Sequence, residues 1–226
     1  MRKKIVENAF ITGCDDKTEW QLPWFIDNYI KYNNTPLVVA DFGMSEEMSN
    51  MIGSHPFVHC VMKLNKESSL KGWFYKPIAM LNIPAKRGVW IDTDCEVLGR
   101  LENIFKLIEP NKLLMATDRP WLKRRNEIWH NSGVIGWQGK PEILYKWNQA
   151  IQENPQVGDQ EVLHNLLNPI TKMTYIAELP NIYNWLRLQV EHDGEDSPNK
   201  KIMHWTGEKG NDRIRGKMKV KEFIDG

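Results

Sequence analysis

The sequence lacks the features that mark several common classes of protein. Its 30 basic and 29 acidic residues give a net charge of +1, so it has no basic field suited to nucleic acid and no acidic excess typical of disorder. No apolar stretch approaches the roughly 20 residues that a transmembrane helix needs. The three cysteines have no paired spacing, and residues 1–8 are basic without the apolar core of a secretory leader. We therefore expect reduced thiols, a cytoplasmic location, no nucleic-acid partner and no transmembrane segment.

The remaining composition is that of a folded globular protein. Hydrophobic residues make up 41% of the chain and charged residues 26%, and no internal repeat or low-complexity segment interrupts it. A length of 226 residues favours one domain over 1–226 with a sizeable core. Ten tryptophans are unusual, because this side chain serves either in cores or in stacking on sugar rings and bases.

Hydrophobic periodicity predicts strands that alternate with helices through the first half of the chain. Such alternation is typical of βαβ units, in which a mostly parallel sheet is covered on both faces. Strands are predicted at 5–12, 37–41, 57–62, 89–91, 113–117, 131–137 and 202–205. Helices are predicted at 20–32, 45–52, 69–81, 142–153, 159–167 and 213–224, with a kink at Pro77 in the third of them.

The most informative segment is an apolar run, 88–91, that ends in Asp92 and Asp94. Ligands of open α/β sheets gather at the carboxyl ends of strands, and side chains at i and i+2 of an extended chain share a face. Two neighbouring carboxylates are hard to keep ionised without a cation, and their hard oxygens suit Mg²⁺ or Mn²⁺. Aspartates also cap turns, but the strand before them and the apolar segment 97–99 after them favour the metal site.

Two further pairs of polar residues each have a structural and a functional interpretation. Asn131 and Ser132 precede Gly133 and an apolar strand, so they form either a turn or an amide and hydroxyl facing a ligand that Gly133 allows to approach closely. Asp159 and Gln160 begin a helix, where an acidic residue satisfies free backbone N–H groups, although both could equally face a substrate.

Three basic side chains leave similar alternatives open. His204 follows a short apolar run and is either a hydrogen-bonded structural residue or a metal ligand beside the carboxylates. Gly207 and Lys209 could receive a diphosphate through a backbone N–H and an ammonium group. Lys76 is either a solvated lysine or a cation that contacts phosphate.

In their order along the chain, these segments resemble the GT-A-fold glycosyltransferases with a D-x-D motif, and family 8 of the glycosyltransferases most closely. The resemblance rests on 90–94 for the D-x-D strand, 131–134 for the N-(S/A)-G strand, 159–160 for the D-Q helix start, 204–207 for the H-x-x-G segment, and 11–16 where the family binds the nucleotide base. It implies a Rossmann-like α/β fold with a mixed, mostly parallel central sheet flanked by helices.

The resemblance also implies roles for individual residues. Mn²⁺ or Mg²⁺ would be held by Asp92, Asp94 and His204 against the diphosphate of a nucleoside diphosphate sugar, most simply a UDP-sugar. The sugar would pass, with retention at the anomeric carbon, to a saccharide or glycoconjugate acceptor. Donor contacts are expected from Thr12, Gly13, Asp15, Lys76, Asp92, Thr93, Gly207 and Lys209, catalytic roles from Asp159, Gln160 and Asn131, and acceptor or sugar-stacking contacts from Ser132, Trp121, Trp129 and Trp205.

Two positions depart from the family pattern. Lys209 lies five residues beyond His204, whereas the family's lysine lies six beyond the histidine in a Lys-Pro-Trp sequence. The loop after Gly13 lacks the family's usual Asn-Tyr pair, so base and sugar preference do not transfer to this chain.

Three rival functions fit parts of the pattern. A phosphatase of the haloacid dehalogenase type needs Thr or Val at the position of Glu96, so it is disfavoured. A sugar nucleotidyltransferase needs a Gly-rich basic loop after the first strand, whereas 13–17 has one glycine and two acids. A non-catalytic carbohydrate-binding protein on the same fold remains the main alternative to the enzyme.

Overall fold

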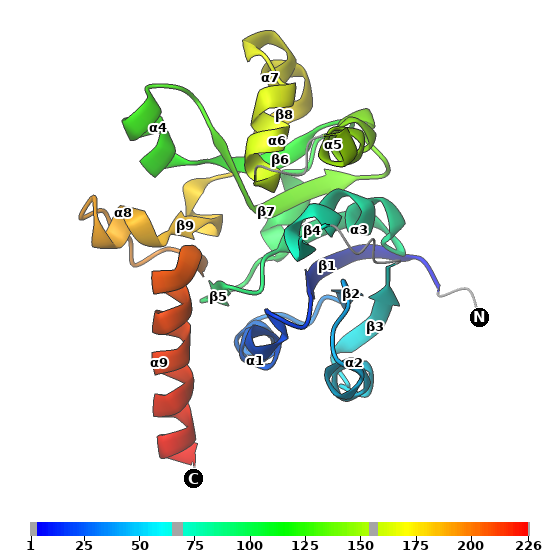
Figure 1. Ribbon diagram of the computed structural model, residues 1–226, viewed down its shortest axis with the longest axis vertical. Coiled ribbons are helices and arrows are strands. Elements are labelled where there is room, and N and C mark those ends of the chain that lie inside the picture. The colour runs from blue at the N-terminus through cyan, green and yellow to red at the C-terminus, as the bar shows by residue number, and fades with distance from the viewer. Residues whose placement is uncertain (1–3, 65–69, 154–157, 226) are drawn as a thin grey trace.

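A seven-stranded sheet forms the centre of the molecule in the computed structural model, which describes residues 4–64, 70–153 and 158–225 (Figure 1). The strands lie in the order β3-β2-β1-β4-β7-β6-β8. β3, β2, β1 and β4 run parallel, β7 runs antiparallel to both β4 and β6, and β8 runs parallel to β6. Their bounds are β1 Val6–Cys14, β2 Leu37–Asp41, β3 Val58–Lys63, β4 Ala85–Ile91, β6 Leu113–Thr117, β7 His130–Gln138 and β8 Ile176–Glu178. The predicted mixed, mostly parallel sheet is confirmed.

Both faces of this sheet are covered, because successive side chains of a strand point in opposite directions. Ile11 and Trp90 belong to the apolar cluster that includes residues of α3, α5 and α6. Phe10 and Ile91 belong to the opposite cluster, which includes residues of α1, α2 and α9. The strands therefore read as nearly continuous apolar runs, as expected for a sheet buried on two sides.

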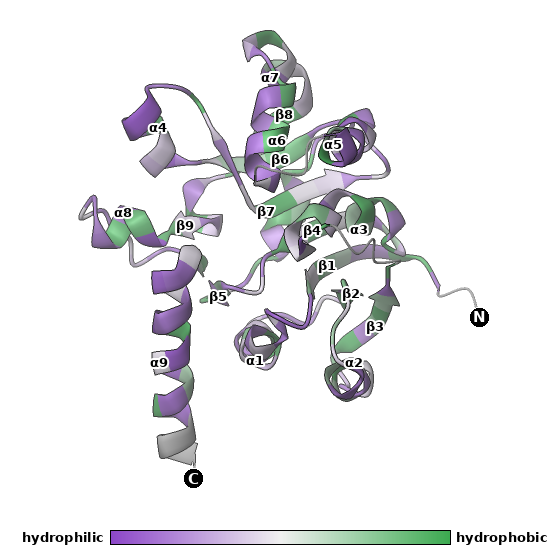
Figure 2. Ribbon diagram, viewed as in Figure 1, coloured by the Kyte–Doolittle hydropathy of each residue, from purple (hydrophilic) through white to green (hydrophobic). Residues whose placement is uncertain are grey.

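The helices agree with the predictions more closely in position than in length. Their bounds are α1 Leu22–Ile30, α2 Glu46–Gly53, α3 Lys76–Asn82, α4 Arg119–Arg125, α5 Glu142–Glu153, α6 Asp159–Leu166, α7 Pro169–Tyr175, α8 Arg187–Glu191 and α9 Gly207–Asp225, with 3₁₀ turns at Glu19–Gln21, Gly72–Tyr75, Glu102–Lys106 and Asn181–Tyr183. The helix predicted at 20–32 is thus a turn followed by a shorter helix. The mostly hydrophilic α9 begins earlier than predicted and buries Ile214 against the sheet cluster (Figure 2).

The helix predicted at 69–81 differs in kind. Ser69 lies outside the described residues, and α3 begins only at Lys76. Pro77 lies in the first turn of α3, where a missing N–H leaves no hydrogen bond unmade. The predicted kink is therefore wrong: Pro77 helps to start the helix that carries Lys76.

A second, three-stranded sheet lies beside the first, in the order β5-β10-β9. Its strands are β5 Cys95–Val97, β9 Trp185–Leu186 and β10 Ile202–His204. β5 follows the D-x-D directly, and its antiparallel pairing with β10 places His204 opposite Cys95. This small sheet therefore brings a residue from the end of the chain to the carboxyl edge of β4.

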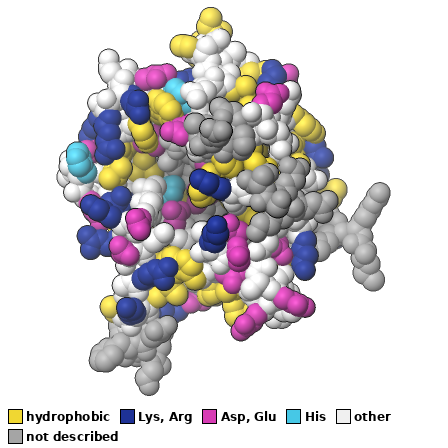
Figure 3. Space-filling view, in the orientation of Figure 1, with side chains coloured by type: hydrophobic (Ala, Val, Ile, Leu, Met, Phe, Trp, Pro, Cys, Tyr) yellow, Lys and Arg dark blue, Asp and Glu magenta, His cyan; other side chains and the backbone are white. Residues whose placement is uncertain are grey.

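The surface agrees with the near-neutral composition. Acidic and basic side chains are interspersed over the face drawn in Figure 3. The three cysteines are buried free thiols. None of the helices in the described part of the chain combines the length and the hydrophobicity that crossing a bilayer demands.

Candidate active site

Asp92 is held at the end of β4 by three elements. Its Oδ1 accepts a hydrogen bond from Trp90 Nε1 at 2.6 Å, and its Oδ2 accepts one from Lys76 Nζ at 2.9 Å. Its backbone N–H donates to Gly133 O of β7 at 2.9 Å. Burial raises the pKa of Asp92; the Lys76 ammonium opposes this effect, and the neighbouring Asp94 carboxylate reinforces it. The site therefore brings two carboxylates together where their side chains are only about one-fifth exposed to solvent.

Lys76 is a buried cation between two carboxylates, so its interpretation as a solvated lysine is wrong. It is 4% exposed, and its Nζ lies 2.9 Å from Asp92 Oδ2 and 3.0 Å from Asp159 Oδ2. It also donates to the backbone oxygen of Ser132 at 3.3 Å. Burial alone would lower the pKa of Lys76, but Asp159 and Asp92 outweigh it and raise the pKa above its usual value. Lys76 thus joins the D-x-D strand to the start of α6.

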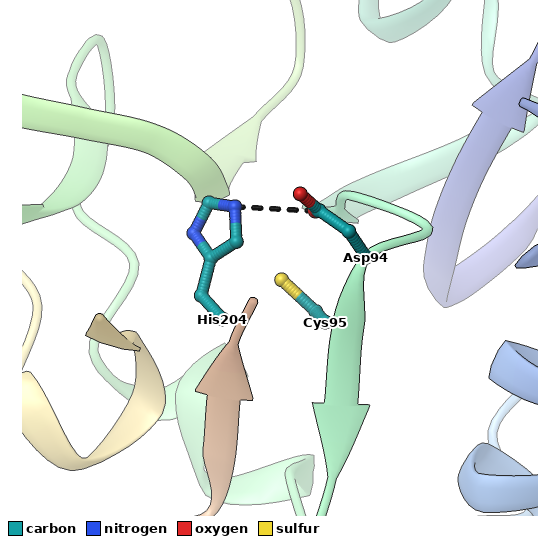
Figure 4. A group of neighbouring side chains, drawn as sticks. All are labelled: Asp94, Cys95 and His204. Atoms are coloured by element: carbon teal, nitrogen blue, oxygen red, sulfur yellow. Dashed lines mark ion pairs between the residues drawn. The ribbon is translucent and has the colours of Figure 1, made fainter. Parts of the chain in front are cut away.

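His204 faces the D-x-D from β10 (Figure 4). Its Nε2 lies 3.2 Å from Asp94 Oδ1 and 4.0 Å from Asp92 Oδ2. Burial would lower the pKa of His204, but Asp94 beside it raises the pKa overall. Its close packing against β7 depends on Gly133, where a Cβ would lie 2.1 Å from the His204 ring.

These side chains have the donor set of a divalent-metal site. Potential ligand atoms of Asp94, Cys95 and His204 lie within 4.8 Å of one another. Asp94 Oδ1 is buried and accepts no hydrogen bond from the described residues, so it is left to pair with His204 or a cation. Burial raises the pKa of the Cys95 thiol, and a protonated sulfur is a poor ligand for a hard cation. The Asp94 oxygen and the His204 nitrogen are donor types that suit Mn²⁺ or Mg²⁺. Asp92 is outside this group, and both of its oxygens accept hydrogen bonds, from Trp90 and Lys76, which it would share with a cation.

A large cleft of about 670 Å³ opens beside this edge of the sheet. It extends from the D-x-D to the loop after β1, with α3 on one side and the start of α9 on the other. Of the predicted donor-binding residues, the lining includes Gly13, Asp15, Lys76, Asp92, Thr93 and Gly207, together with Asp94. Thr12 is fully buried within β1, and Lys209 is exposed on α9, so both lie outside the lining.

One wall of the large cleft contains two residues that sequence analysis missed. Thr93 Oγ1 donates to Gln21 Oε1 at 2.6 Å, and Gln21 Nε2 donates to Asn211 Oδ1 at 2.8 Å. Both amides line the cleft. They join the D-x-D loop to α9 across nearly the whole length of the chain, a proximity that no local sequence signal indicates.

A small cleft of about 260 Å³ is lined by a different set of predicted residues. Asn131 and Gln160 lie in it with Trp121 and Trp129. The two tryptophan rings stack with centroids 5.4 Å apart, and Trp129 in turn stacks on His164 of α6 at 3.5 Å. The cleft thus has an aromatic wall beside polar amides.

Asp118, at the N-cap of α4, organises the polar side of the small cleft. Its Oδ2 accepts from Asn131 Nδ2 at 3.2 Å and from Gln160 Nε2 at 3.1 Å. Sequence analysis missed this residue, although Asp118 follows the end of strand β6 as Asp92 follows β4. The strand-end rule that identified Asp92 could have found it.

Two predicted acceptor-side residues lie elsewhere. Ser132 is buried in β7, where its backbone N–H donates to Gln160 Oε1 at 3.3 Å, and it lines neither cleft. Trp205 lines a third groove between α1 and α9, and its Nε1 donates to Glu96 Oε2 at 2.9 Å. This arrangement therefore does not favour stacking of Trp205 on a ligand in the large or the small cleft.

Comparison by sequence with models of known families and with curated proteins gives no match. Solved structures do match. The glycosyltransferase GlyE of Streptococcus pneumoniae TIGR4 has a TM-score of 0.66 at 17% identity over 90% of this chain and 55% of its own. The galactosyltransferase LgtC, crystallised with donor and acceptor sugar analogues, has a TM-score of 0.60 at 12% identity over 88% of this chain and 87% of its own. The bifunctional glycosyltransferase WbbM has a TM-score of 0.61 at 13% identity over 90% of this chain and 46% of its own.

The chain spans about half the length of the GlyE and WbbM chains and most of the length of LgtC. At these identities the similarity establishes the fold, which is that of GT-A glycosyltransferases. The predicted fold is confirmed on that basis, whereas the roles of individual residues remain to be argued from the site.

Proposed function

We propose that this protein is a metal-dependent glycosyltransferase that moves a sugar from a nucleoside diphosphate sugar, most simply a UDP-sugar, to a saccharide or glycoconjugate acceptor. One observation carries the proposal. Asp92, Asp94 and His204 come from segments 110 residues apart, and His204 Nε2 lies 3.2 Å from Asp94 and 4.0 Å from Asp92. The two aspartates line a cleft large enough for a sugar nucleotide, and His204 is buried behind them. A structural role alone would not require such a concentration of buried charge.

Within this proposal the large cleft receives the donor. Asp92, Asp94 and His204 would hold Mn²⁺ or Mg²⁺, which supplies Lewis-acid neutralisation of charge on the diphosphate as it leaves. Gly13 and Asp15, in the loop after β1, also line the cleft, and the base and ribose would bind beside them. Lys76 would act chiefly by holding Asp92 and Asp159 in place, because its charge is already shared by two carboxylates.

The small cleft receives the acceptor under the same proposal. Its aromatic wall, Trp121 and Trp129, suits the apolar face of a sugar ring, and Asn131 and Gln160 offer amides to hydroxyl groups. Asp159 precedes Gln160 at the start of α6 and turns its carboxylate toward Lys76 and the D-x-D. A carboxylate held in this position, next to Gln160 of the small cleft, is suited to stabilising an oxocarbenium-like centre. We propose retention at the anomeric carbon because the family resemblance implies it.

The test is a screen of nucleoside diphosphate sugars for donor hydrolysis and thermal stabilisation, with and without Mn²⁺. We expect one donor to raise the melting temperature only with the metal present and to be hydrolysed slowly. A donor at 100 times its Kd stabilises the native state by about 2.7 kcal/mol, a shift of roughly 5–10 °C for a chain of this size. If the protein binds free sugars equally well with and without the nucleotide and Mn²⁺, it is better described as a non-catalytic carbohydrate-binding protein.

A further inference from the structure

A buried chain of hydrogen bonds runs from the small cleft to the metal-binding edge of the large one. Asn184 is its least expected member: it follows the turn Asn181–Tyr183, is 1% exposed and lines neither cleft. Its Oδ1 lies 3.0 Å from His204 Nδ1, and its Nδ2 donates to Asn131 Oδ1 at 2.9 Å. Asn184 therefore connects the imidazole to the amide that Asp118 holds.

Asn131 fixes which groups donate and which accept along this series of hydrogen bonds. Its Oδ1 accepts from the backbone N–H of Gly133 at 2.9 Å, so the oxygen cannot exchange places with the amide nitrogen. Its Nδ2 donates to the Asp118 carboxylate, and an ionised carboxylate only accepts hydrogen bonds. Both ends of this amide are therefore assigned by groups that have no alternative role.

The assignment propagates to His204. Because Asn131 Oδ1 is an acceptor, the atom of Asn184 that faces it must be the Nδ2 donor. Asn184 Oδ1 then faces the imidazole, so His204 Nδ1 must carry a proton to donate to it. The lone pair of the neutral ring is left on Nε2, which faces Asp94 and Asp92.

We propose that Asn184 is a positioning residue that holds His204 as the Nδ1–H tautomer, so that Nε2 is free for a divalent cation, and that Asp118 in the small cleft sets the direction of the chain. The inference rests on the proposed function for the presence of the metal. Hydrogen bonds to the second nitrogen of a ligating histidine fix its tautomer and orientation, and their loss typically lowers metal affinity about 10- to 100-fold.

The first measurement needs no metal. In ¹⁵N-labelled protein at alkaline pH, where the ring is neutral, two-bond ¹⁵N–¹H spectra distinguish the two tautomers. The His204 signals are assigned by their loss in His204→Gln. We expect the proton on Nδ1; a proton on Nε2 would overturn the proposal, whatever the protein's function.

The second measurement compares two asparagine variants of one turn by calorimetric titration with MnCl₂. Asn184→Ala should weaken Mn²⁺ binding about 10- to 100-fold and allow the Nε2–H tautomer to appear. Asn181→Ala is the matched control, because the Asn181 amide is buried and makes no hydrogen bond to the described residues. It should leave both readouts unchanged.

A third variant guards against a simple loss of folding. In Asn184→Asp a carboxylate oxygen can still accept from His204 Nδ1, so the tautomer should be restored although the bond to Asn131 is lost. Equal Mn²⁺ affinity in the parent and in a folded Asn184→Ala would refute the positioning role. If the parent itself binds no Mn²⁺, the proposed function fails, and the tautomer spectrum still decides the role of Asn184.

Discussion

The large and small clefts are connected by the ion pair of Lys76, which lines the large cleft, with Asp159, the residue before Gln160 of the small cleft, but they are built differently. The large cleft uses the carboxyl ends of β1 and β4, which are neighbours in a parallel sheet. The small cleft is assembled from α4, the antiparallel β7, the start of α6 and the segment after β9. In a parallel sheet built from βαβ units, the residues that follow the strands always lie at the same edge. The small cleft has no such repeated geometry, because several short elements from different parts of the chain form it.

The largest expected effect on activity comes from Asp94, at the proposed metal site. Under the proposed function, Asp94→Asn should lower sugar transfer and metal-dependent nucleotide binding by about 10²- to 10³-fold or more, because it removes a charge that would hold the metal against the leaving diphosphate. Its free energy of unfolding should fall by no more than about 2 kcal/mol, because the fold loses only the ion pair between Asp94 Oδ1 and His204 Nε2 at 3.2 Å. Kinetic assays and urea unfolding measure the two effects. Full transfer without metal in this variant would contradict the assignment of Asp94 as a metal ligand. The control is Asp27→Asn on α1.

The second effect tests the residue that joins the two clefts. Lys76→Met leaves Asp92 and Asp159 buried without their shared cation, so we expect a loss of about 3–5 kcal/mol in unfolding free energy. Lys76→Met combined with Asp159→Asn should recover part of that loss, because one uncompensated charge is then removed. If urea unfolding shows no recovery in the double variant, the ion pairs do not couple α3 to α6.

The same lysine predicts a pH dependence. Its pKa in the folded protein is raised above 10.5, so on alkaline titration the unfolded chain loses this proton first. The stabilisation from Lys76 should be complete below about pH 10.5 and should disappear as the pH rises through the higher folded value. Urea midpoints measured across this range should fall less steeply in Lys76→Met than in the parent.

A smaller effect distinguishes the clefts by substrate. Trp129→Ala should raise the KM for the acceptor about tenfold, a loss of about 1.4 kcal/mol, while hydrolysis of the donor stays unchanged. Trp205→Ala is the matched control, because Trp205 lines the third groove and should affect neither value. Equal effects of the two substitutions would show that the aromatic wall of the small cleft has no special role.

The smallest expected effect concerns the lysine that departs from the family spacing. Lys209 is exposed and lies outside the lining of the large cleft, so Lys209→Ala should leave the donor KM within about twofold and stability within about 0.5 kcal/mol. Asn211→Ala, two residues further along α9, should raise the donor KM more. The reverse order would restore the role that the sequence predicted for Lys209.

The contrast between the clefts also explains how much the sequence could reveal. Asp92 and Asp94 were predictable because a buried strand ends abruptly in charge, and His204 because the family resemblance placed it. The bounds of β2 and β6 agree with prediction because their apolar runs are bordered by turn residues. Gln21, Asn184 and Asn211 could not be predicted, since each acts through a partner more than 15 residues away along the chain. The short helices α4, α7 and α8 were missed because five to seven residues are too few for periodicity to register.

The missing side chain at Gly133 has a consequence for recognising relatives of this protein. Because a Cβ there would overlap the His204 imidazole and crowd Asn131 Oδ1 at 3.0 Å, every other amino acid is excluded as long as the histidine keeps its place. A glycine two residues after the asparagine can therefore serve as a filter for distant sequences. Chains that have the acidic pair and the histidine but a larger residue at this position should not assemble the same centre.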